Sequence, residues 1–180
     1  MKATGIVRRI DDLGRVVIPK EIRRTMRIRE GDPLEIFTNR EGEVIFKKYS
    51  AMESVAQKVQ VFADALAKAT AKPAAVCDRD HVLAVAGMPK KDYIERGVSE
   101  ALSELMQRRE NFVRKAGDTV RMPLTEAGSA SLSVAIPIIS ESDCIGAITL
   151  IVPDNGAVAT DSDVRMASIL AAVLSSEMAQ

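Results

Sequence analysis

The first fifty residues constrain the fold most, because they alternate short apolar segments with turn-forming residues and contain little else. Segments rich in β-branched residues, which favour strands, lie at residues 4–10, 15–18, 34–38 and 43–47. Pro19 ends the second of these and suits the first turn of a short helix over residues 20–26. Turn-forming residues predict turns at residues 11–14, 31–33 and 39–42.

A segment of this kind buries too little apolar surface to be stable as a single chain. Short strands and one helical turn make a small core, and no disulfide or metal motif is present to support it. Two copies that interleave their strands into one shared barrel would enlarge the core and cover the sheet edges. We therefore expect residues 1–50 to form a domain that dimerises.

The remaining residues predict a second, larger domain preceded by a helix. Residues 51–71 have apolar residues at helical spacing and are predicted as a linker helix that ends at Lys72-Pro73. In residues 72–180 we predict helices at 99–108 and after Thr160, and strands at 74–77, 82–86, 120–124, 132–139 and 145–152. Strands joined through turns indicate an α+β fold with a mainly antiparallel sheet and flanking helices.

The composition is that of a globular protein in a reducing compartment. Hydrophobic residues make up 47% and charged residues 28% of the 180 residues, which excludes a disordered chain. No apolar run is long enough to span a bilayer, and the N-terminus lacks the apolar region of a signal peptide. Cys77 and Cys144 lie far apart in sequence, so we expect a cytoplasmic protein with reduced thiols.

Charge is distributed unevenly, although the formal net charge is zero. Residues 1–50 hold twelve Lys and Arg against eight Asp and Glu, a surplus of four positive charges that the rest of the chain offsets. A basic domain on an acidic body predicts that the basic part contacts a polyanion and that the body does not.

The motifs of the first fifty residues resemble the AbrB-type swapped-hairpin DNA-binding family. The resemblance rests on Leu-Gly-Arg-Val-Val-Ile-Pro at residues 13–19, Ile-Arg-Arg at 22–24, Glu-Gly-Asp at 30–32 and Leu-Glu-Ile at 34–36. It implies a domain-swapped β-barrel. Met26-Arg27 departs from the Leu-Gly that many members have there, so we expect Arg27 to end the helix less sharply.

The whole chain resembles the stage V sporulation protein T family, in which a GAF domain follows such a DNA-binding domain. Ile136-Pro137-Ile138, Ile145-Gly146-Ala147 and the order of the elements carry this second resemblance. It implies a GAF-like regulatory and assembly domain over residues 72–180. It also implies a regulator that activates or represses sporulation genes according to the position of its DNA site.

The resemblance also implies which residues contact double-stranded DNA. The matching positions are Arg8, Arg15, Arg23 and Arg24, with Lys2 and Arg9 nearby. A guanidinium stays charged and can bind phosphate or the edge of guanine in a bidentate manner. The basic segment has one amide, Asn39, to read adenine, so we expect recognition by DNA shape and tolerance of many sequences. The alternative is that some arginines, such as Arg9, only form surface ion pairs.

The second domain leaves two roles open. The GAF-like fold can hold a small effector, or it can serve only in assembly through apolar stripes on residues 51–70 and 160–178, which would make a homotetramer. Aromatic residues make up 3% of the chain, which leaves little to stack a flat cofactor, so we expect no resident cofactor. A single histidine, His81, with no nucleophile beside it predicts no enzyme and no metal site. The rival function is that of an antitoxin, because AbrB-type barrels also serve there.

Overall fold

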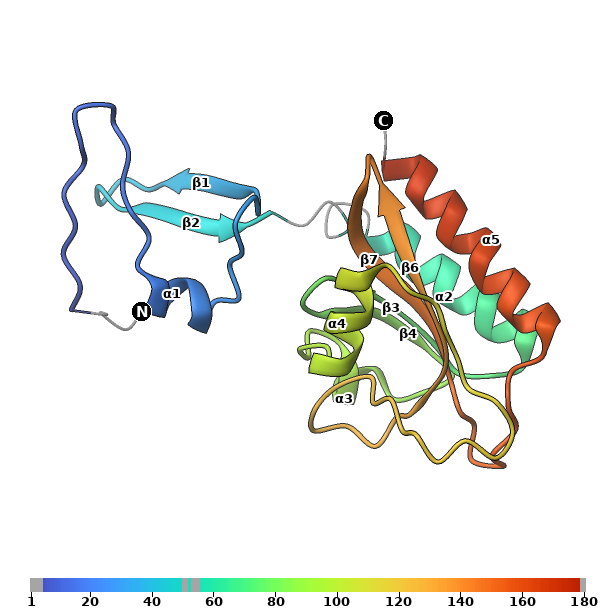
Figure 1. Cartoon of the computed structure of the whole chain (residues 1–180). Helices are drawn as coiled ribbons and strands as arrows, with labels where there is room; N and C mark the ends of the chain where they lie inside the picture. The colour runs from blue at the N-terminus through green and yellow to red at the C-terminus, as the bar shows by residue number, and fades with distance from the viewer. Residues whose placement is uncertain (1–4, 50–51, 53–55, 179–180) are drawn as a thin grey trace. The chain divides into compact units, whose positions relative to one another are not determined.

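The computed structural model describes residues 5–49, 52 and 56–178. The chain divides into two compact units, Met1–Tyr49 and Ser50–Gln180, which we call unit 1 and unit 2. Both combine helices with antiparallel strands (Figure 1). The predicted α+β class is therefore confirmed.

The described residues of unit 1, 5–49, form one short helix and one hairpin. Helix α1 spans Lys20–Thr25, and strands β1 (Leu34–Thr38) and β2 (Val44–Lys48) pair antiparallel, with Ile36 opposite Phe46. The side chain of Asn39 closes the hairpin loop, because its Oδ1 accepts hydrogen bonds from the backbone N–H groups of Glu41 and Glu43. The predicted hairpin is present where the sequence placed it.

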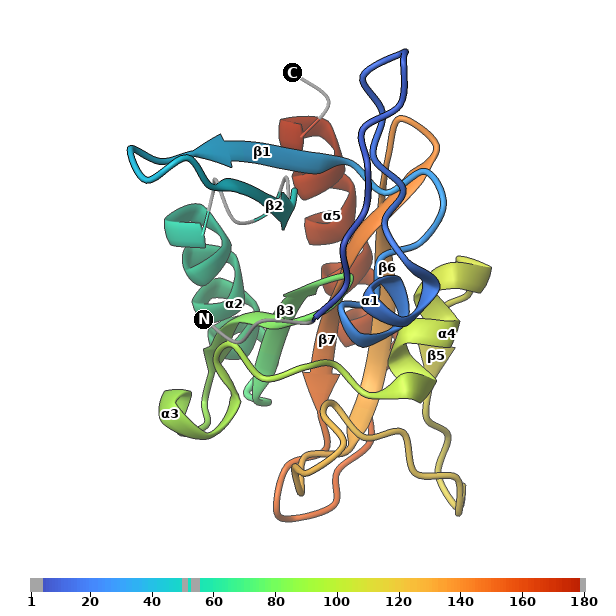
Figure 2. The ribbon, with the colours of Figure 1, turned by 90° about the vertical axis from the view of Figure 1, so that its left-hand side faces the viewer.

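The two predicted N-terminal strands differ from the prediction. Residues 5–10 and 15–18 are two extended arms on either side of the turn at residues 11–14, and neither is a strand of a sheet in the described part of the chain (Figures 1 and 2). A strand needs a neighbour to supply backbone partners, and β1 and β2 pair with each other rather than with the arms. The β-branched residues predict extended backbone, which the arms have, but the described residues hold no strand that pairs with them.

Unit 1 also has almost no core of its own. Among the described residues 5–49, Pro19 alone is buried as a whole residue, and the side chain of Asp32 is 3% exposed. Large apolar side chains are exposed on the arms and on both strands of the hairpin, including Val7 (85% exposed), Val17 (71%) and Ile36 (61%). Exposed apolar area of this extent marks an interaction surface.

Unit 2 is built on a five-stranded antiparallel sheet. Its strands are β3 (Ala74–Asp78), β4 (Val82–Ala86), β5 (Phe112–Val113), β6 (Leu132–Ser140) and β7 (Asp143–Ile151), in the order β4-β3-β7-β6-β5. The helices are α2 (Ala56–Thr70), α3 (Lys90–Tyr93), α4 (Glu100–Arg108) and α5 (Asp161–Met178). Helices α2 and α5 cover one face of the sheet, and α3, α4 and long loops cover the other (Figure 1).

Alternating residues of the central strands therefore fill two cores. Val76, Ile136 and Ile148 pack against α2 and α5, whereas Ala75, Ala135 and Ala147 face α4 and the loops. Strands β3 and β6 are buried along nearly their whole length. A sheet covered on both faces explains the continuous apolar runs of these strands.

The helix that we predicted as a linker over residues 51–71 packs on the sheet. Val59, Ala63 and Leu66 of α2 are buried in the core that α5 shares. Helix α2 therefore belongs to the body of unit 2, and it ends next to β3.

The region between α4 and β6 departs from the prediction. Residues 120–124 were predicted as a strand, but they form a loop that touches Ser131 through an isolated bridge at Pro123. Pro123 has no N–H to donate to a ladder, which explains why no strand forms. The edge of the sheet is instead the two-residue strand β5, next to β6.

One buried ion pair fastens the start of α5 to the turn after α2. Lys72 Nζ lies 2.9 Å from Asp163 Oδ2, and the two side chains are 12% and 7% exposed. The same carboxylate accepts a hydrogen bond from the Thr160 N–H, while Thr160 Oγ1 accepts one from the Asp163 N–H. The prediction that Thr160 caps the last helix is confirmed.

Neither cysteine forms a disulfide. Burial raises the pKa of the Cys77 thiol, and its Sγ donates to the carbonyl oxygen of Ala147. Cys77 is therefore a small core residue that stays protonated. Among the described helices, none is long and apolar enough to cross a bilayer.

Candidate nucleic-acid interface

The turn between the two arms fixes one of the predicted DNA-binding arginines. Asp11 Oδ1 accepts hydrogen bonds from the backbone N–H groups of Leu13 (3.1 Å) and Arg15 (2.7 Å). Asp11 Oδ2 accepts from Arg15 Nε at 2.8 Å, although the Arg15 side chain is 71% exposed. The guanidinium is thus held by one edge, and its terminal N–H groups are free to bind a ligand.

The charge of Asp11 supports this arrangement. Hydrogen bonds from the backbone N–H and the guanidinium of Arg15 hold the pKa of the Asp11 carboxyl below its usual value. The carboxylate therefore stays ionised at neutral pH and keeps Arg15 oriented. The alternative reading has Arg9, Arg27 and Arg29 pair on the surface with Asp11, Asp12 or Glu30. Asp11 pairs with Arg15, four residues along the chain.

The first arm carries two further predicted residues. Arg8 and Arg9 are exposed, and Arg8 Nη1 donates to the backbone oxygen of Val7 at 3.3 Å. Helix α1 carries Arg23 and Arg24, which are also exposed. Lys2, which we predicted nearby, lies outside the described residues.

The end of α1 is sharper than predicted. Arg27 adopts a left-handed backbone with φ +52°, and the Ile28 N–H donates to the Arg23 carbonyl oxygen at 2.7 Å. This bond closes the last turn of the helix in the manner usually reserved for glycine. An arginine at this position therefore keeps the geometry of the helix end, at the cost of a strained backbone.

Lys48 has a structural role that the sequence did not reveal. Its Nζ donates to the backbone oxygen of Arg27 at 3.1 Å and lies 3.7 Å from Asp32 Oδ2. Asp32 Oδ2 also accepts from the Arg29 N–H at 2.8 Å. This network joins β2 to the end of α1, so Lys48 supports the surface that presents Arg23 and Arg24.

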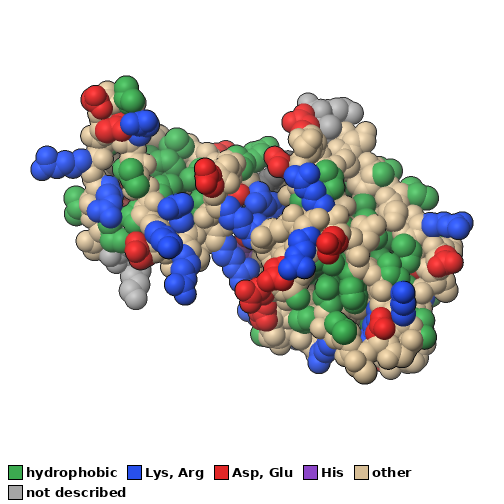
Figure 3. Space-filling view, in the orientation of Figure 1, with side chains coloured by type: hydrophobic (Ala, Val, Ile, Leu, Met, Phe, Trp, Pro, Cys, Tyr) green, Lys and Arg blue, Asp and Glu red, His purple; other side chains and the backbone are tan. Residues whose placement is uncertain are grey.

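Basic and apolar side chains are interspersed on the surface of unit 1 (Figure 3). Five of the six predicted residues are described, and all five are exposed: Arg8, Arg9, Arg15, Arg23 and Arg24. Their cationic groups can reach phosphate oxygens without first losing a buried partner. The surface has the chemistry of a nucleic-acid interface, and its apolar part offers contacts to protein.

Known protein families match the two parts of the chain separately. Residues 53–179 match the family described as "Stage V sporulation protein T C-terminal, transcription factor", and residues 7–53 match "Antidote-toxin recognition MazE, bacterial antitoxin". Stage V sporulation protein T of Bacillus subtilis (strain 168) is 47% identical over 154 residues, which cover 86% of each chain. The transition state regulatory protein AbrB of the same organism is 61% identical over 49 residues, 27% of this chain and half of that protein.

Among solved structures, the GAF domain of an Acinetobacter phosphoenolpyruvate-protein phosphotransferase covers 74% of this chain. The match covers 84% of that chain, with a TM-score of 0.54 and 12% sequence identity. Likeness at this identity shows the fold alone, and it confirms the GAF-like architecture of unit 2. With a family match over most of the chain and a relative that is 47% identical over 86% of each chain, the chain belongs to the stage V sporulation protein T family of transcription factors, which regulate sporulation.

Proposed function

We propose that two copies of unit 1 combine their arms into one barrel, and that this dimer binds double-stranded DNA through Arg8, Arg9, Arg15, Arg23 and Arg24, with Lys2. The observation that carries the proposal is the exposure of apolar side chains on the arms and hairpin, next to exposed arginines. A second chain covers the apolar residues and doubles the arginines on one surface. The arms then become strands with the neighbours they lack in a single chain.

Recognition of DNA rests on shape more than on base contacts. Arginine supplies charge and phosphate contacts, whereas unit 1 offers one amide, Asn39, and that side chain is used within the hairpin loop. The regulator therefore accepts degenerate sites. It activates or represses sporulation genes according to where a site lies.

Unit 2 assembles dimers into a tetramer. Val61 on α2 and Ile169 and Val173 on α5 are apolar and exposed, at 65%, 63% and 40%. These helices cover the same face of the sheet, so their outer sides can pack against the same helices of another subunit. Comparison of residues 1–52 with the full chain tests this role: loss of higher assembly in the shorter chain is expected, and equal assembly states would contradict it.

Salt dependence of duplex binding tests the DNA interface. Arg8, Arg15, Arg23 and Arg24 of two chains offer about eight phosphate contacts, so the slope of log affinity against log salt approaches roughly −7. Arg15→Ala or Arg23→Ala removes two contacts per dimer, weakens binding at every sequence, and changes the slope from roughly −7 to roughly −5. Arg108→Ala is the matched control, because Arg108 is an exposed arginine of unit 2. A slope near zero, or unchanged affinity in both variants, would contradict the interface.

An antitoxin role is the second candidate, because residues 7–53 match an antitoxin family. An antitoxin of this type typically ends in a disordered segment that wraps its toxin. Here a packed unit follows, with two cores about its sheet. A toxin that co-purifies with the full chain would favour the antitoxin role; we expect none.

The proposal includes no catalytic step and no resident cofactor, and it places the regulator in the cytoplasm, where its DNA lies. Exposed His81 has no nucleophile joined to it by a described hydrogen bond. Unit 2 therefore acts through binding and assembly rather than through chemistry on a substrate.

A further inference from the structure

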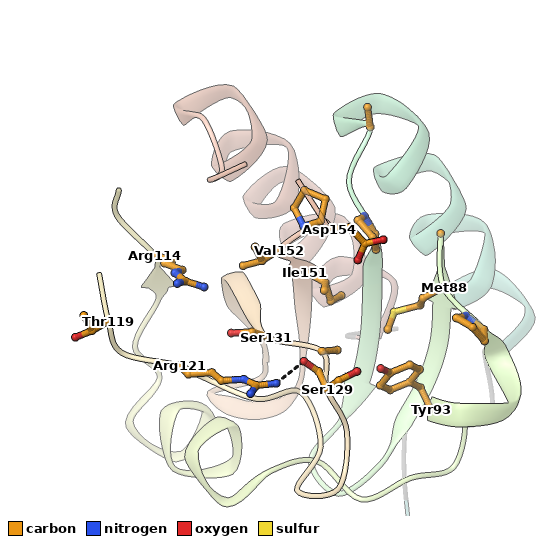
Figure 4. Close-up of a pocket in the computed structure, with 16 residues that line it drawn as sticks. Met88, Tyr93, Arg114, Thr119, Arg121, Ser129, Ser131, Ile151, Val152 and Asp154 are labelled. Carbon is orange, nitrogen blue, oxygen red and sulfur yellow. Dashed lines mark hydrogen bonds between the residues drawn. The ribbon is translucent and has the colours of Figure 1, made fainter. Parts of the chain in front are cut away.

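Unit 2 contains a cavity of about 820 Å³ on the side of the sheet away from α2 and α5 (Figure 4). Its floor is the end of β7 at Ile151 and Val152, and its sides come from the loop after β4 and from the loop over residues 114–121. A volume of this size lies within the range of small-molecule sites.

The two sides of the cavity differ in chemistry. Arg114, Thr119 and Arg121 stand on one side in Figure 4, and Met88 and Tyr93 stand on the other. Buried Ile151 and Ala130 extend the apolar part. A ligand that fits both sides has a charged end and a short apolar body.

Two arginines against one carboxylate in the lining favour an anion at the charged end, because neither arginine has a carboxylate partner among the described residues. Arg114 Nη2 donates to the backbone oxygen of Asp118 at 3.2 Å, and Arg121 Nη2 donates to the backbone oxygen of Ser129 (Figure 4). One N–H of each guanidinium is thus used to hold the side chain, and the remaining donors are available for bidentate binding.

Ser131 adds a second, independent indication. It lines the cavity, and its Oγ is shielded from solvent with no hydrogen-bond partner in the described chain. Buried hydroxyl groups nearly always have a partner, so this hydroxyl can gain one by turning toward a bound ligand. Rotation about a single bond turns this hydroxyl toward the cavity.

The lining also limits the kind of anion. Asp154 places one negative charge at the edge of the cavity, which disfavours a doubly charged phosphate. Tyr93 is the one aromatic residue of the lining, so a flat base or chromophore has little to stack on. We propose that this cavity binds a small organic carboxylate with a short aliphatic body, a role that does not depend on the DNA interface proposed above.

The test uses the full chain with methionine methyl groups labelled with ¹³C. Met88 lines the cavity and reports binding, whereas Met166 and Met178 on α5 pack on the opposite face of the sheet and serve as internal controls. The probes are acetate, 3-methylbutanoate and succinate, with 3-methylbutanamide as the neutral analogue and inorganic phosphate as the alternative anion. We expect 3-methylbutanoate to shift the Met88 signal and the amide to leave it in place.

Variants assign the binding to the cavity. Arg121→Gln removes an exposed arginine and raises the dissociation constant at least about tenfold, as expected when a hydrogen bond to a charged group is lost. Ser131→Ala raises it a few-fold, and Arg108→Gln, which removes the same charge on α4, leaves it unchanged. Thermal unfolding of each variant shows that the fold is intact.

Three results would overturn the proposal. The first is an unshifted Met88 signal with every carboxylate at concentrations up to about 20 mM, beyond the weakest specific complexes. The second is an equal shift with the amide, and the third is tighter binding of phosphate than of any carboxylate. DNA affinity measured without carboxylate is expected to be the same in Arg121→Gln as in the unaltered chain, so failure of this proposal is distinguishable from failure of the DNA interface.

Discussion

Units 1 and 2 use apolar side chains of the same kinds but bury them to opposite extents. Ile148 on β7 is fully buried between the sheet and its helices, whereas Ile36 on β1 is 61% exposed. Unit 2 pairs all its long strands within one chain, while the arms of unit 1 have no strand neighbour in the described chain. Unit 2 therefore buries its apolar residues within one chain, whereas the described part of unit 1 leaves most of its own exposed.

The largest expected effect comes from a charge on the hairpin face of unit 1. Ile36 and Phe46 are opposite each other in register and share a face with Leu34 and Val44. If a second chain covers this face as proposed, Ile36→Asp buries a carboxylate there and is expected to destabilise unit 1 by more than about 3 kcal/mol. Urea unfolding of unit 1 measures the loss of stability, and sedimentation measures the loss of the dimer.

Val120→Asp is the matched control for that experiment. Val120 lies in a loop of unit 2 and is 66% exposed, close to the exposure of Ile36. Its substitution is expected to change stability by no more than about 0.5 kcal/mol. Equal, small effects of both substitutions would show that the apolar face of unit 1 is solvated and would remove the contrast between the units.

Gly146→Ala is expected to damage unit 2 without affecting unit 1. A Cβ at this position would collide with the carbonyl oxygen of Cys77 on β3 and lie 3.1 Å from the Cα of Asp78. Overpacking against backbone destabilises unit 2 by about 2–3 kcal/mol. Gly156→Ala is the control: its φ of +72° adds strain but its surroundings are open, so a smaller loss of about 1 kcal/mol is expected. Thermal unfolding measures the loss of stability in each variant. A larger loss for Gly156→Ala than for Gly146→Ala would contradict the close approach of β7 to β3 at Gly146.

The buried ion pair predicts a pH dependence that is confined to unit 2. Burial alone would raise the pKa of Asp163, but hydrogen bonds from Thr160 and Lys72 lower it on balance below 3.8. Because the folded pKa is the lower one, the stabilisation is fully present above the unfolded value and is lost as the pH falls through the folded pKa. Asp163→Asn is therefore expected to cost about 1–3 kcal/mol at pH 7.

The difference in the free energy of unfolding between Asp163→Asn and the unaltered chain should shrink as the pH falls below 3.8. Chemical unfolding at several pH values measures this change. A difference that stays constant down to the acid limit would show that the carboxylate contributes nothing through its charge.

The smallest expected effect compares two helix ends, one in each unit. Arg27 follows α1 with φ +52°, and Arg109 follows α4 with φ +56°. Glycine avoids the left-handed penalty, so Arg27→Gly and Arg109→Gly are each expected to stabilise their own unit by about 1 kcal/mol. Thermal unfolding that resolves the two units measures each gain in stability. A rise in the midpoint of unit 2 for Arg27→Gly, or of unit 1 for Arg109→Gly, would contradict the expectation.

The sequence predicted the helices, turns and strands whose signals lie within a few adjacent residues. Pro19 before α1, Asn39 in the hairpin loop and Ser99 at the start of α4, where Ser99 Oγ accepts from the Leu102 N–H, are all signals carried by a few adjacent residues. The long strands β6 and β7 were equally clear, because burial on both faces makes them continuously apolar.

Features that depend on distant contacts were harder to predict. The sequence indicates that the arms pair with a second copy, which stays a prediction, and Pro123 interrupts a segment whose apolar residues otherwise favour a strand. The exposed arginines could be named because their motif is long. The pairing of Arg15 with Asp11 and the support from Lys48 depend on geometry that spacing alone does not fix.

The contrast between the units is tested most directly by the concentration dependence of unfolding. Residues 1–50 and residues 51–180 are produced as separate chains, and the thermal midpoint of each is measured over a hundredfold range of about 1 to 100 μM protein. The account predicts a midpoint that rises with concentration for residues 1–50, because folding and dimerisation are one step. A folded monomer of residues 1–50 at low micromolar concentration, with a midpoint independent of concentration, would contradict it.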